Sequence, residues 1–506
     1  MQFRLRAARL APLALALAGS AALAATPTVT LSPTLNHPQG TTQVSGTGFG
    51  FNEAVDVYFD TADEMLVVTD SSGNFSAHTL GVPASAPPGT HWVTAIGRKD
   101  GIAAQTVFLV HTRWNSHGFN ERGQRRNSYE NTIDASNVAS LDVAWSAATG
   151  NLVFSSPAVA QVAIPYNPYV FVGSSDHNLY AFNSTGAVAW KKSTGGAIFS
   201  SPAISSTTVY VGSEDGKLYA FKAGTGASAW TSPATTGGAI DSSPVVANGI
   251  VYVGSEDARL YAFKAADGTA AWASAALTGG IITFSSPAVA DGMVYIGSLD
   301  GELYAFDATT GAQVWGFTTS GQIVSGPAVA GGVVYFSSND HKIYALNAKT
   351  GLQKWAVTTG SLASSSPAVA NGVVYIMSYD QKLYALRASD GATLWTGTLT
   401  GGGYSGPAVA NGVVYVGTDG YDMEAFNAGG CGTATCAPLW TAATGGVVYS
   451  SPTISDGMLY FTSYDGSLYA YALNGGNNAA YKFRRQTQPP SYASLHPDLR
   501  LKPVQH

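Results

Sequence analysis

A unit of about forty residues recurs along this chain, and it limits the possible folds more than any other feature of the sequence. The stretch 285–315 shows one whole unit: a Ser-Ser-Pro element, three short apolar runs separated by turn pairs such as Asp-Gly, and a closing Trp. The Ser/Gly-Pro element recurs at Pro157, Pro202, Pro244, Pro287, Pro327, Pro367, Pro407 and Pro452. Units of this length stack or arrange themselves radially, because no single unit can bury its apolar face alone.

Each unit has the pattern of a four-stranded antiparallel meander, since its apolar runs are divided by turn pairs that favour positive φ. The proline removes a backbone donor from the first strand, which should therefore be a sheet edge, as the innermost strand of a propeller blade is. An extra strand, 141–145, precedes the first unit, and the last unit stops at Tyr471 without a Trp. Pairing these two ends would close a ring. We therefore predict an all-β fold with an eight-bladed β-propeller.

The run Phe306-Asp-Ala-Thr-Thr-Gly-Ala-Gln-Val-Trp315, repeated at 346–355, resembles the tryptophan-docking motif of the quinoprotein-type (PQQ-like) β-propellers. The resemblance extends over about two-thirds of the chain and is specific for fold. It implies either of two functions, because this propeller serves both pyrroloquinoline quinone (PQQ) dehydrogenases and the scaffold lipoprotein of the outer-membrane β-barrel assembly machine. The fold alone does not choose between them.

Five regions are predicted. Residues 1–24 carry three arginines, an apolar run and a small-x-small site, as a signal peptide does. Residues 25–112 alternate in hydrophobicity between turn signals and resemble an immunoglobulin-like β-sandwich. Residues 113–138 form a linker, 139–472 the propeller, and 473–506 a mobile tail. We expect an exported protein, periplasmic or secreted, and without a lipid anchor because no cysteine follows the cleavage site.

The charge of the chain limits its partners. The formal net charge is −6, and loss of the leader arginines makes the mature chain more acidic. This balance argues against nucleic acid and anionic membrane as partners. No segment after the leader is apolar for long enough to span a bilayer. We expect a protein or another envelope component as partner.

The candidate site is the mouth of the ring, where the residue before each Ser-x-Pro or Gly-Pro element should lie. These residues are Phe154, Phe199, Asp241, Phe284, Val324, Ser364, Tyr404 and Tyr449. They vary while the neighbouring positions repeat. The aromatic side chains either cap the packing between blades or line a half-apolar pocket for a peptide, an extended strand or a flat ligand. Aspartates in the nearby turns should make this mouth acidic.

The residues that a PQQ enzyme of this family would need are largely missing. The resemblance implies cationic side chains and a calcium site around the quinone, a Trp below it and often a disulfide between adjacent cysteines above it. Asp241 is the sole rim carboxylate, every Trp of the ring closes a repeat, and no Cys-Cys pair exists. Cys431 and Cys436 are predicted to form a disulfide across a loop of the seventh unit. We predict no catalytic residue and no metal ligand.

The sequence thus favours a non-catalytic, exported binding scaffold that docks a polypeptide or envelope component on the mouth, through Phe154, Phe199, Asp241, Phe284, Tyr404 and Tyr449. No cofactor is expected. One alternative is a PQQ-dependent oxidoreductase with an atypical pocket, using PQQ with calcium. Another is a surface protein that binds glycans through the sandwich.

Overall fold

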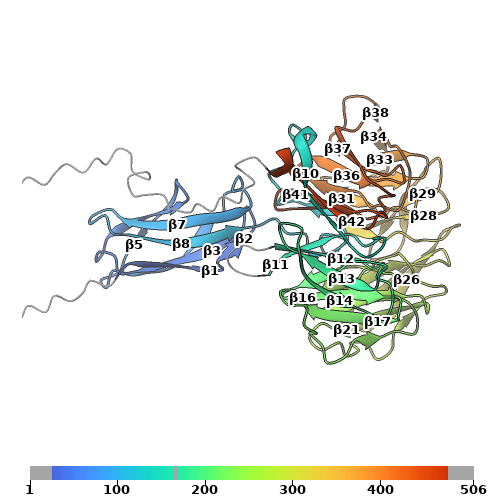
Figure 1. The fold of residues 1–506 in the computed structure, drawn as a ribbon, viewed down its shortest axis with the longest axis horizontal. Helices are drawn as coiled ribbons and strands as arrows, with labels where there is room; N and C mark the ends of the chain where they lie inside the picture. The colour runs from blue at the N-terminus through green and yellow to red at the C-terminus, as the bar shows by residue number, and fades with distance from the viewer. Residues whose placement is uncertain (1–25, 163–167, 477–506) are drawn as a thin grey trace, which may run out of the picture.

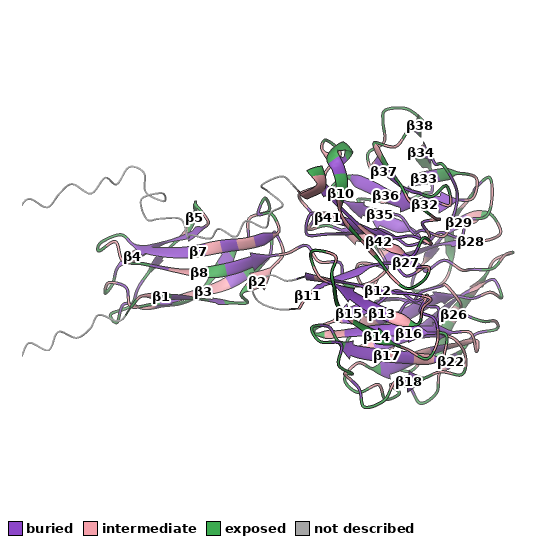
Figure 2. Cartoon of the chain, in the orientation of Figure 1, coloured by how far each residue is buried: buried purple, intermediate pink, exposed green. Residues whose placement is uncertain are grey.

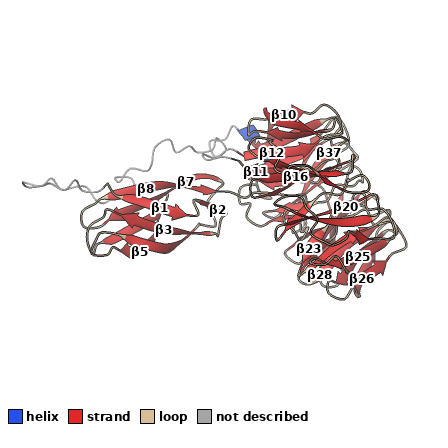
Figure 3. Cartoon of the chain, turned by 90° about the horizontal axis from the view of Figure 1, so that it is seen from below, coloured by secondary structure: helices blue, strands red, loops and turns tan. Residues whose placement is uncertain are grey.

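The computed structural model describes residues 26–162 and 168–476 (Figure 1). The predicted signal peptide and all but the first residues of the predicted tail lie outside this range. Nearly all regular structure in the described residues is β-strand (Figure 3). The short 3-10 helices are η1 (Val138–Ser140) and η2 (Asn474–Gly476). Among the described residues, none of the helices has the length and hydropathy to cross a membrane.

The N-terminal lobe, at the left of Figure 1, consists of two sheets packed face to face. One has the strand order β1-β3-β6 and the other β2-β8-β7-β4-β5. The strands are β1 (Thr28–Ser32), β2 (Leu35–Asn36), β3 (Thr41–Thr47), β4 (Ala54–Phe59), β5 (Ala62–Val68), β6 (Phe75–Gly81), β7 (Gly89–Gly97) and β8 (Ala103–Val110). Alternate residues such as Val44 in β3 and Val55 and Val57 in β4 point into one shared core.

The described residues after the linker form eight sheets of four or five strands, which we number in the order of their inner strands. Sheet 1 comprises β11 (Ala158–Gln161), β12 (Pro168–Gly173), β13 (Asn178–Phe182) and β14 (Val188–Ser193), and sheet 2 comprises β15 (Ala203–Ser205), β16 (Thr208–Ser213), β17 (Lys217–Lys222) and β18 (Ala234–Thr235). Sheet 3 comprises β19 (Val245–Ala247), β20 (Ile250–Ser255), β21 (Arg259–Lys264) and β22 (Ala276–Leu277), and sheet 4 comprises β23 (Ala288–Ala290), β24 (Met293–Gly297), β25 (Glu302–Asp307) and β26 (Gln313–Thr318).

Sheet 5 comprises β27 (Ala328–Ala330), β28 (Val333–Ser338), β29 (Lys342–Asn347) and β30 (Gln353–Thr358), and sheet 6 comprises β31 (Ala368–Ala370), β32 (Val373–Ser378), β33 (Lys382–Arg387), β34 (Thr393–Thr398) and β38 (Thr435–Cys436). Sheet 7 comprises β9 (Arg126–Asn127), β35 (Ala408–Ala410), β36 (Val413–Gly417), β37 (Asp422–Asn427) and β39 (Trp440–Ala443), and sheet 8 comprises β40 (Thr453–Ser455), β41 (Met458–Thr462), β42 (Ser467–Leu473) and β10 (Leu141–Ala148). The two middle strands of each sheet are buried on both faces (Figure 2), because the sheets pack against one another.

Sheet 8 joins the two ends of the repeat array. Its outer strand is β10, which pairs antiparallel with β42 from Leu141 opposite Leu473 to Ala148 opposite Ser467. This is the pairing that the extra strand and the missing Trp predict from the sequence.

Each closing Trp of the motif links one sheet to the next. The indole Nε1–H of Trp315 in sheet 4 donates to the carbonyl oxygen of Ala348 in sheet 5 at 3.0 Å. Its ring lies against Gly351, where φ is +70° and a Cβ would come within 2.8 Å of the indole. Trp190, Trp230, Trp272, Trp355, Trp395 and Trp440 make the same kind of bond to the following sheet.

Candidate functional site: the mouth of the ring

Two rings of serine hydroxyls hold the inner strands just below the mouth. The first Ser of each Ser-Ser-Pro element bonds within its own sheet. In sheet 4, for example, the backbone N–H of Gly297 donates to Ser285 Oγ at 2.9 Å. The second links neighbouring sheets, as where Ser201 N–H donates to Ser243 Oγ at 3.0 Å. The last sheet is tied to the first in the same way, because Ser451 N–H donates to Ser156 Oγ at 2.8 Å. These bonds fix the rim residue that precedes each element.

All the predicted rim residues line one cavity. They are Phe154, Phe199, Asp241, Phe284, Val324, Ser364, Tyr404 and Tyr449. The cavity measures only about 30 Å³, room for little more than ordered water. The rim aromatics are half-buried and fill the mouth, with Phe154 and Phe284 stacked at a centroid distance of 4.8 Å. The predicted residues therefore come together, and they form a nearly closed floor rather than a deep pocket.

A group of tyrosines occupies one side of the mouth. Tyr404 and Tyr449 meet edge to face at 5.3 Å. Tyr379 and Tyr464, from turns between second and third strands, extend the group at 5.9 Å from Tyr404 and 5.2 Å from Tyr449. Burial, and then the neighbouring Tyr449 and Tyr404, raise the pKa of Tyr464 to about 12. The sequence analysis missed Tyr379 and Tyr464, although the middle residue of their Ser-x-Asp turns also varies between units.

A group of carboxylates occupies another part of the mouth, at sheets 2 and 3. Asp241 is buried and its Oδ1 has no hydrogen-bond partner among the described residues, while Oδ2 accepts a long bond from Thr283 Oγ1 at 3.4 Å. Burial, and then the charges of Glu256 and Glu214, raise the pKa of Asp241 to about 7. An unsatisfied carboxylate oxygen inside a cavity is costly unless a cation or a donor reaches it.

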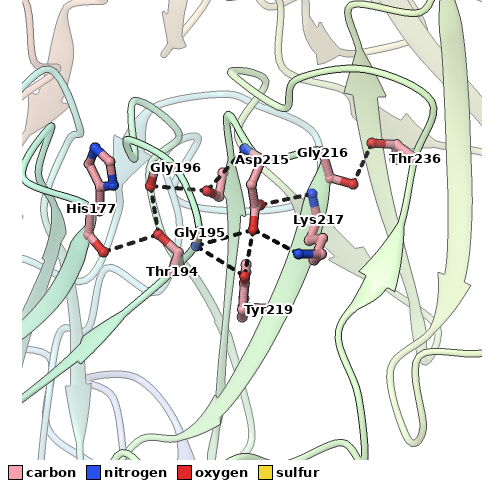
Figure 4. A network of polar contacts seen from close by, with 10 residues as sticks. His177, Thr194, Gly195, Gly196, Asp215, Gly216, Lys217, Tyr219 and Thr236 are labelled. Atoms are coloured by element: carbon pink, nitrogen blue, oxygen red, sulfur yellow. Dashed lines mark hydrogen bonds and ion pairs between the residues drawn. The ribbon is translucent and has the colours of Figure 1, made fainter.

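The turn aspartates are occupied by the fold itself. Figure 4 shows Asp215, whose Oδ2 accepts the hydroxyl of Tyr219 at 2.6 Å and the backbone N–H of Gly195 at 3.1 Å. Burial acts against the charged form, but these hydrogen bonds prevail and the pKa of Asp215 is lowered. Equivalent Asp–Tyr bonds join Asp176 to Tyr180, Asp257 to Tyr261, Asp300 to Tyr304, Asp340 to Tyr344, Asp380 to Tyr384 and Asp465 to Tyr469. In each of these aspartates one carboxylate oxygen is held by the tyrosine, while Oδ1 of Asp257 and of Asp380 is buried without a hydrogen-bond partner in the described residues.

The predicted linker runs inside the ring and closes it from the other end. Backbone N–H groups of six inner strands donate to linker carbonyls. The pairs are Val159 to Trp114, Ile204 to Asn115, Val289 to Glu121, Val329 to Arg122, Val369 to Gln124 and Val409 to Arg125, at 2.7–2.9 Å. The inner strands were expected to be sheet edges, and in these six sheets the linker pairs with that edge. The reason is that unpaired strand edges need partners.

His117 and Arg125 of the linker lie under the rim, and the sequence analysis did not single them out as site residues. His117 lines the mouth cavity. Arg125 donates to His117 Nε2, and His117 Nδ1 lies 3.2 Å from Ser156 Oγ. Burial, and then the nearby Arg125, lower the pKa of His117 well below its usual value. The histidine is therefore neutral, accepting at Nε2 and donating from Nδ1.

Cys431 and Cys436 form a disulfide. The bridge lies in the loop between β37 and β39, next to β38, which adds a strand to sheet 6. Neither cysteine lines the mouth cavity. The disulfide cross-links the two sides of this inserted loop.

The mouth does not fit PQQ. The quinone is a rigid tricyclic tricarboxylate, whereas the rings of Phe154 and Phe284 stack on each other and the mouth cavity measures only about 30 Å³. The floor consists of His117 and serines instead of a Trp, and the nearby charges Glu214, Asp241 and Glu256 would repel a multiply anionic ligand. We derive no step through this cofactor.

Comparison with known proteins identifies the fold. Residues 175–290, 273–366 and 359–431 match the model of a PQQ-repeat family described as outer membrane protein assembly factor BamB, so that the matched span, 175–431, covers slightly more than half of the chain. No curated protein matches the chain.

Solved structures agree at the level of fold. BamB from Moraxella catarrhalis is 20% identical with a TM-score of 0.56, over 66% of this chain and 99% of that one. Quinohemoprotein alcohol dehydrogenase from Comamonas testosteroni is 16% identical with a TM-score of 0.60, over 72% of this chain and 81% of that one. A europium-containing methanol dehydrogenase is 14% identical with a TM-score of 0.60, over 72% and 98%. The prediction of an all-β fold of PQQ-like propeller type is confirmed, and the chain belongs to the PQQ-repeat family described as outer membrane protein assembly factor BamB.

Proposed function

We propose that the protein is a non-catalytic binding scaffold whose eight sheets are the blades of one closed propeller and whose mouth docks a polypeptide. Pairing of β10 with β42 and the bond from Ser451 to Ser156 support a closed ring. A ring closed in this way presents a rigid rim on which side chains from many sheets have fixed positions.

The observation that carries the proposal is the unpartnered Oδ1 of Asp241 at a mouth lined with aromatic rings. Asp241 lies with Glu214 and Glu256, and the tyrosines Tyr404 and Tyr449 line the same mouth. A basic side chain can pair with the carboxylates, while the aromatic rings accept apolar groups and cations over their faces. The partner that fits this surface is an extended segment with Lys or Arg beside an apolar or aromatic residue.

The small volume of the mouth favours docking of a surface over enclosure of a small substrate. A cavity of about 30 Å³ cannot bury a drug-sized molecule, which needs several hundred Å³. A polypeptide can instead lie across the rim and insert single side chains between rings. The proposal assigns the mouth no reaction.

We further propose that the protein is exported and acts in the envelope or outside the cell, with residues 25–112 as an immunoglobulin-like domain, 113–138 as linker and 139–472 as propeller. The leader-like residues 1–24 and the disulfide Cys431–Cys436 support export, because disulfides persist in oxidising compartments. The two face-to-face sheets of the N-terminal lobe support the domain assignment.

The test is selection of peptides from a displayed random library on the purified protein, followed by measurement of Kd by fluorescence anisotropy. Selected peptides should be enriched in Lys or Arg next to aromatic or apolar residues. The double variant Phe199→Ala/Tyr449→Ala, and separately Asp241→Asn, should weaken binding about tenfold or more, since each removes a central contact. Leu352→Ala serves as the control, because Leu352 is exposed in a loop at the other end of its sheet. Equal Kd values for wild type and the mouth variants would show that the mouth is not the docking surface.

A further inference from the structure

A second cavity lies between the N-terminal lobe and the linker, at the end of the inner strands away from the mouth. Beside the cavity, the backbone N–H of Thr112 donates to Asp456 Oδ1 at 2.6 Å. Asp456 belongs to the turn that follows the inner strand β40. Tyr449 of the mouth precedes the same strand. The cavity has a volume of about 350 Å³, which is within the range of small-molecule sites.

The lining of this cavity is basic, in a chain whose net charge is −6. It contains two arginines, two histidines, three side-chain amides, a serine, a tyrosine and a phenylalanine. None of its lining residues is a carboxylate. The charged and ionisable members are His37, His111, Arg113 and Arg126. The lining therefore offers donors for an anion and contains no carboxylate side chain.

Arg126 is held in place but is not paired. Its backbone lies in β9, which runs parallel to β35 with Arg126 opposite Val409. Its guanidinium makes no hydrogen bond or ion pair with any residue in the described ranges. The contrast with other arginines is clear, since Arg98 pairs with Asp56, Arg122 with Asp291 and Arg387 with Asp390.

His111 and His37 bring the N-terminal lobe into the same site. His111 follows β8, and its Nδ1 is buried without a hydrogen-bond partner in the described structure. Burial, and then the charges of Arg113 and His37, lower the pKa of His111 to about 3. His37 is positioned by stacking on Tyr129 of the linker at a centroid distance of 3.8 Å. A bound anion would offset the positive potential that these groups share.

We propose that this cavity binds a small oxyanion with at least two acidic oxygens, such as a phosphate ester or a di- or tricarboxylate. Guanidinium groups pair with carboxylate and phosphate through parallel N–H···O bonds, and imidazole and amide N–H groups complete such a site. The volume accommodates a small molecule and excludes a folded partner. The bound anion would contact His37 and His111 of the lobe and Arg126 of the linker together, so that it would also strengthen the contact between these two parts.

The experiment is isothermal titration calorimetry of the purified protein at low ionic strength with inorganic phosphate, citrate and, as an uncharged reference, glycerol. Saturable binding of phosphate, citrate or both is expected, with none for glycerol, and the stronger ligand identifies the phosphate or the carboxylate class. Arg126→Gln should weaken this binding about tenfold or more, as expected for a lost bond to a charged group.

Arg122→Gln is the matched control. It removes one positive charge from the same linker, but Arg122 pairs with Asp291 and does not line the cavity. Its Kd should equal that of wild type, and both variants should unfold at the wild-type temperature. Absence of saturable binding of either anion to the wild type would overturn the proposal. An equal loss in the two variants would do the same, because it would show that general charge and not this cavity attracts the anion.

Discussion

Phe154 and Phe284 stack with their ring centroids 4.8 Å apart and their planes 26° from parallel, although they precede the inner strands of sheets 1 and 4. The ring of Phe154 also contacts those of Phe199, Tyr404 and Tyr449. These contacts join sheets that share no strand pairing. The rim is thus a small aromatic core of its own, which joins distant sheets of the ring and is the surface that we propose for docking.

Replacing Phe154 by Ala should lower the free energy of unfolding by about 1–3 kcal/mol. The loss should be smaller than for a fully buried Phe because the ring is half-buried. Urea denaturation measures the change. Val324→Ala on the same rim is the control and should cost less than about 1 kcal/mol, since the valine is smaller and has no ring to stack. Equal losses would show that the stacked rings add nothing to stability.

Two glycines of sheet 5 should differ in how much their replacement by Ala destabilises the protein, because only one of them packs against the docking Trp. Gly351→Ala should destabilise the protein by about 2 kcal/mol or more, because a Cβ would lie 2.8 Å from the Trp315 ring at a φ of +70°. Gly332→Ala has a similar φ of +74° and open space around the Cβ, so only backbone strain of about 1 kcal/mol applies. Thermal or urea unfolding separates the two costs. Similar values would indicate that packing against the indole is not restrictive.

Asp241 should make stability depend on pH. Its folded pKa of about 7 lies above the reference value of 3.8, so between these values the folded state keeps a proton that the unfolded state has lost. The free energy of unfolding contributed by this group is present below about pH 4 and lost as the pH rises through 7. Asp241→Asn should remove that slope. The free energy of unfolding of Asp241→Asn should exceed that of wild type by near zero at pH 4 and by about 4 kcal/mol at pH 8, measured by urea unfolding. A difference that stays constant with pH would contradict the assignment.

Asn127 should be a main anchor of the linker. Its Nδ2 donates to the carbonyls of Thr112 and Ile454 at 2.7 Å each, and its Oδ1 accepts from the N–H groups of Tyr129 and Glu130. Asn127→Ala leaves buried backbone groups without partners and should cost about 2–4 kcal/mol.

Limited proteolysis should then show faster cleavage between residues 113 and 135 in Asn127→Ala. Asn131→Ala provides the comparison, because Asn131 bonds to Ala84 and Ala86 at a partly exposed contact. Its effect should stay below about 1 kcal/mol. If both variants are cleaved alike, the linker is held by its backbone bonds alone.

PQQ and calcium, added together, should leave the unfolding temperature unchanged, because the stacked rings of Phe154 and Phe284 leave a mouth cavity of only about 30 Å³. A ligand specific for the folded state adds about 2.7 kcal/mol at a hundred times its Kd, so true binding would be visible in a thermal scan. A rise that requires both additives would favour the oxidoreductase alternative. It would also show that the mouth opens in solution.

The sequence predicts the propeller because its information is local and repeated. Turn pairs, the Ser-Pro element and the docking Trp each act within one unit or between neighbours, so reading one unit such as 285–315 explains most of the ring. The rim position could be found for the same reason, since comparison between units isolates the residue that varies. Tyr404 and Tyr449 were predicted in this way.

The path of the linker could not be read from the sequence, because its partners are spread over the whole repeat region. Glu121 bonds to Val289 and Arg125 to Val409, pairings that no periodicity encodes. The available signal was indirect: inner strands with free N–H groups require acceptors, and the linker is a segment without a repeat that lies directly before the ring. The roles of His117 and Arg125 beneath the rim follow from that path.

Closure of the ring by β10 has a consequence for how the protein is made. The strand Leu141–Ala148 is synthesised before strands β11 to β41, and its partner β42 is synthesised after all of them. The linker likewise meets inner strands that emerge from the ribosome one after another. A chain cut short before Ser467 lacks β42 and leaves β10 with an exposed edge, whereas a chain that includes β42 covers it. Pairing of β10 therefore requires that translation has reached the last strand of the ring.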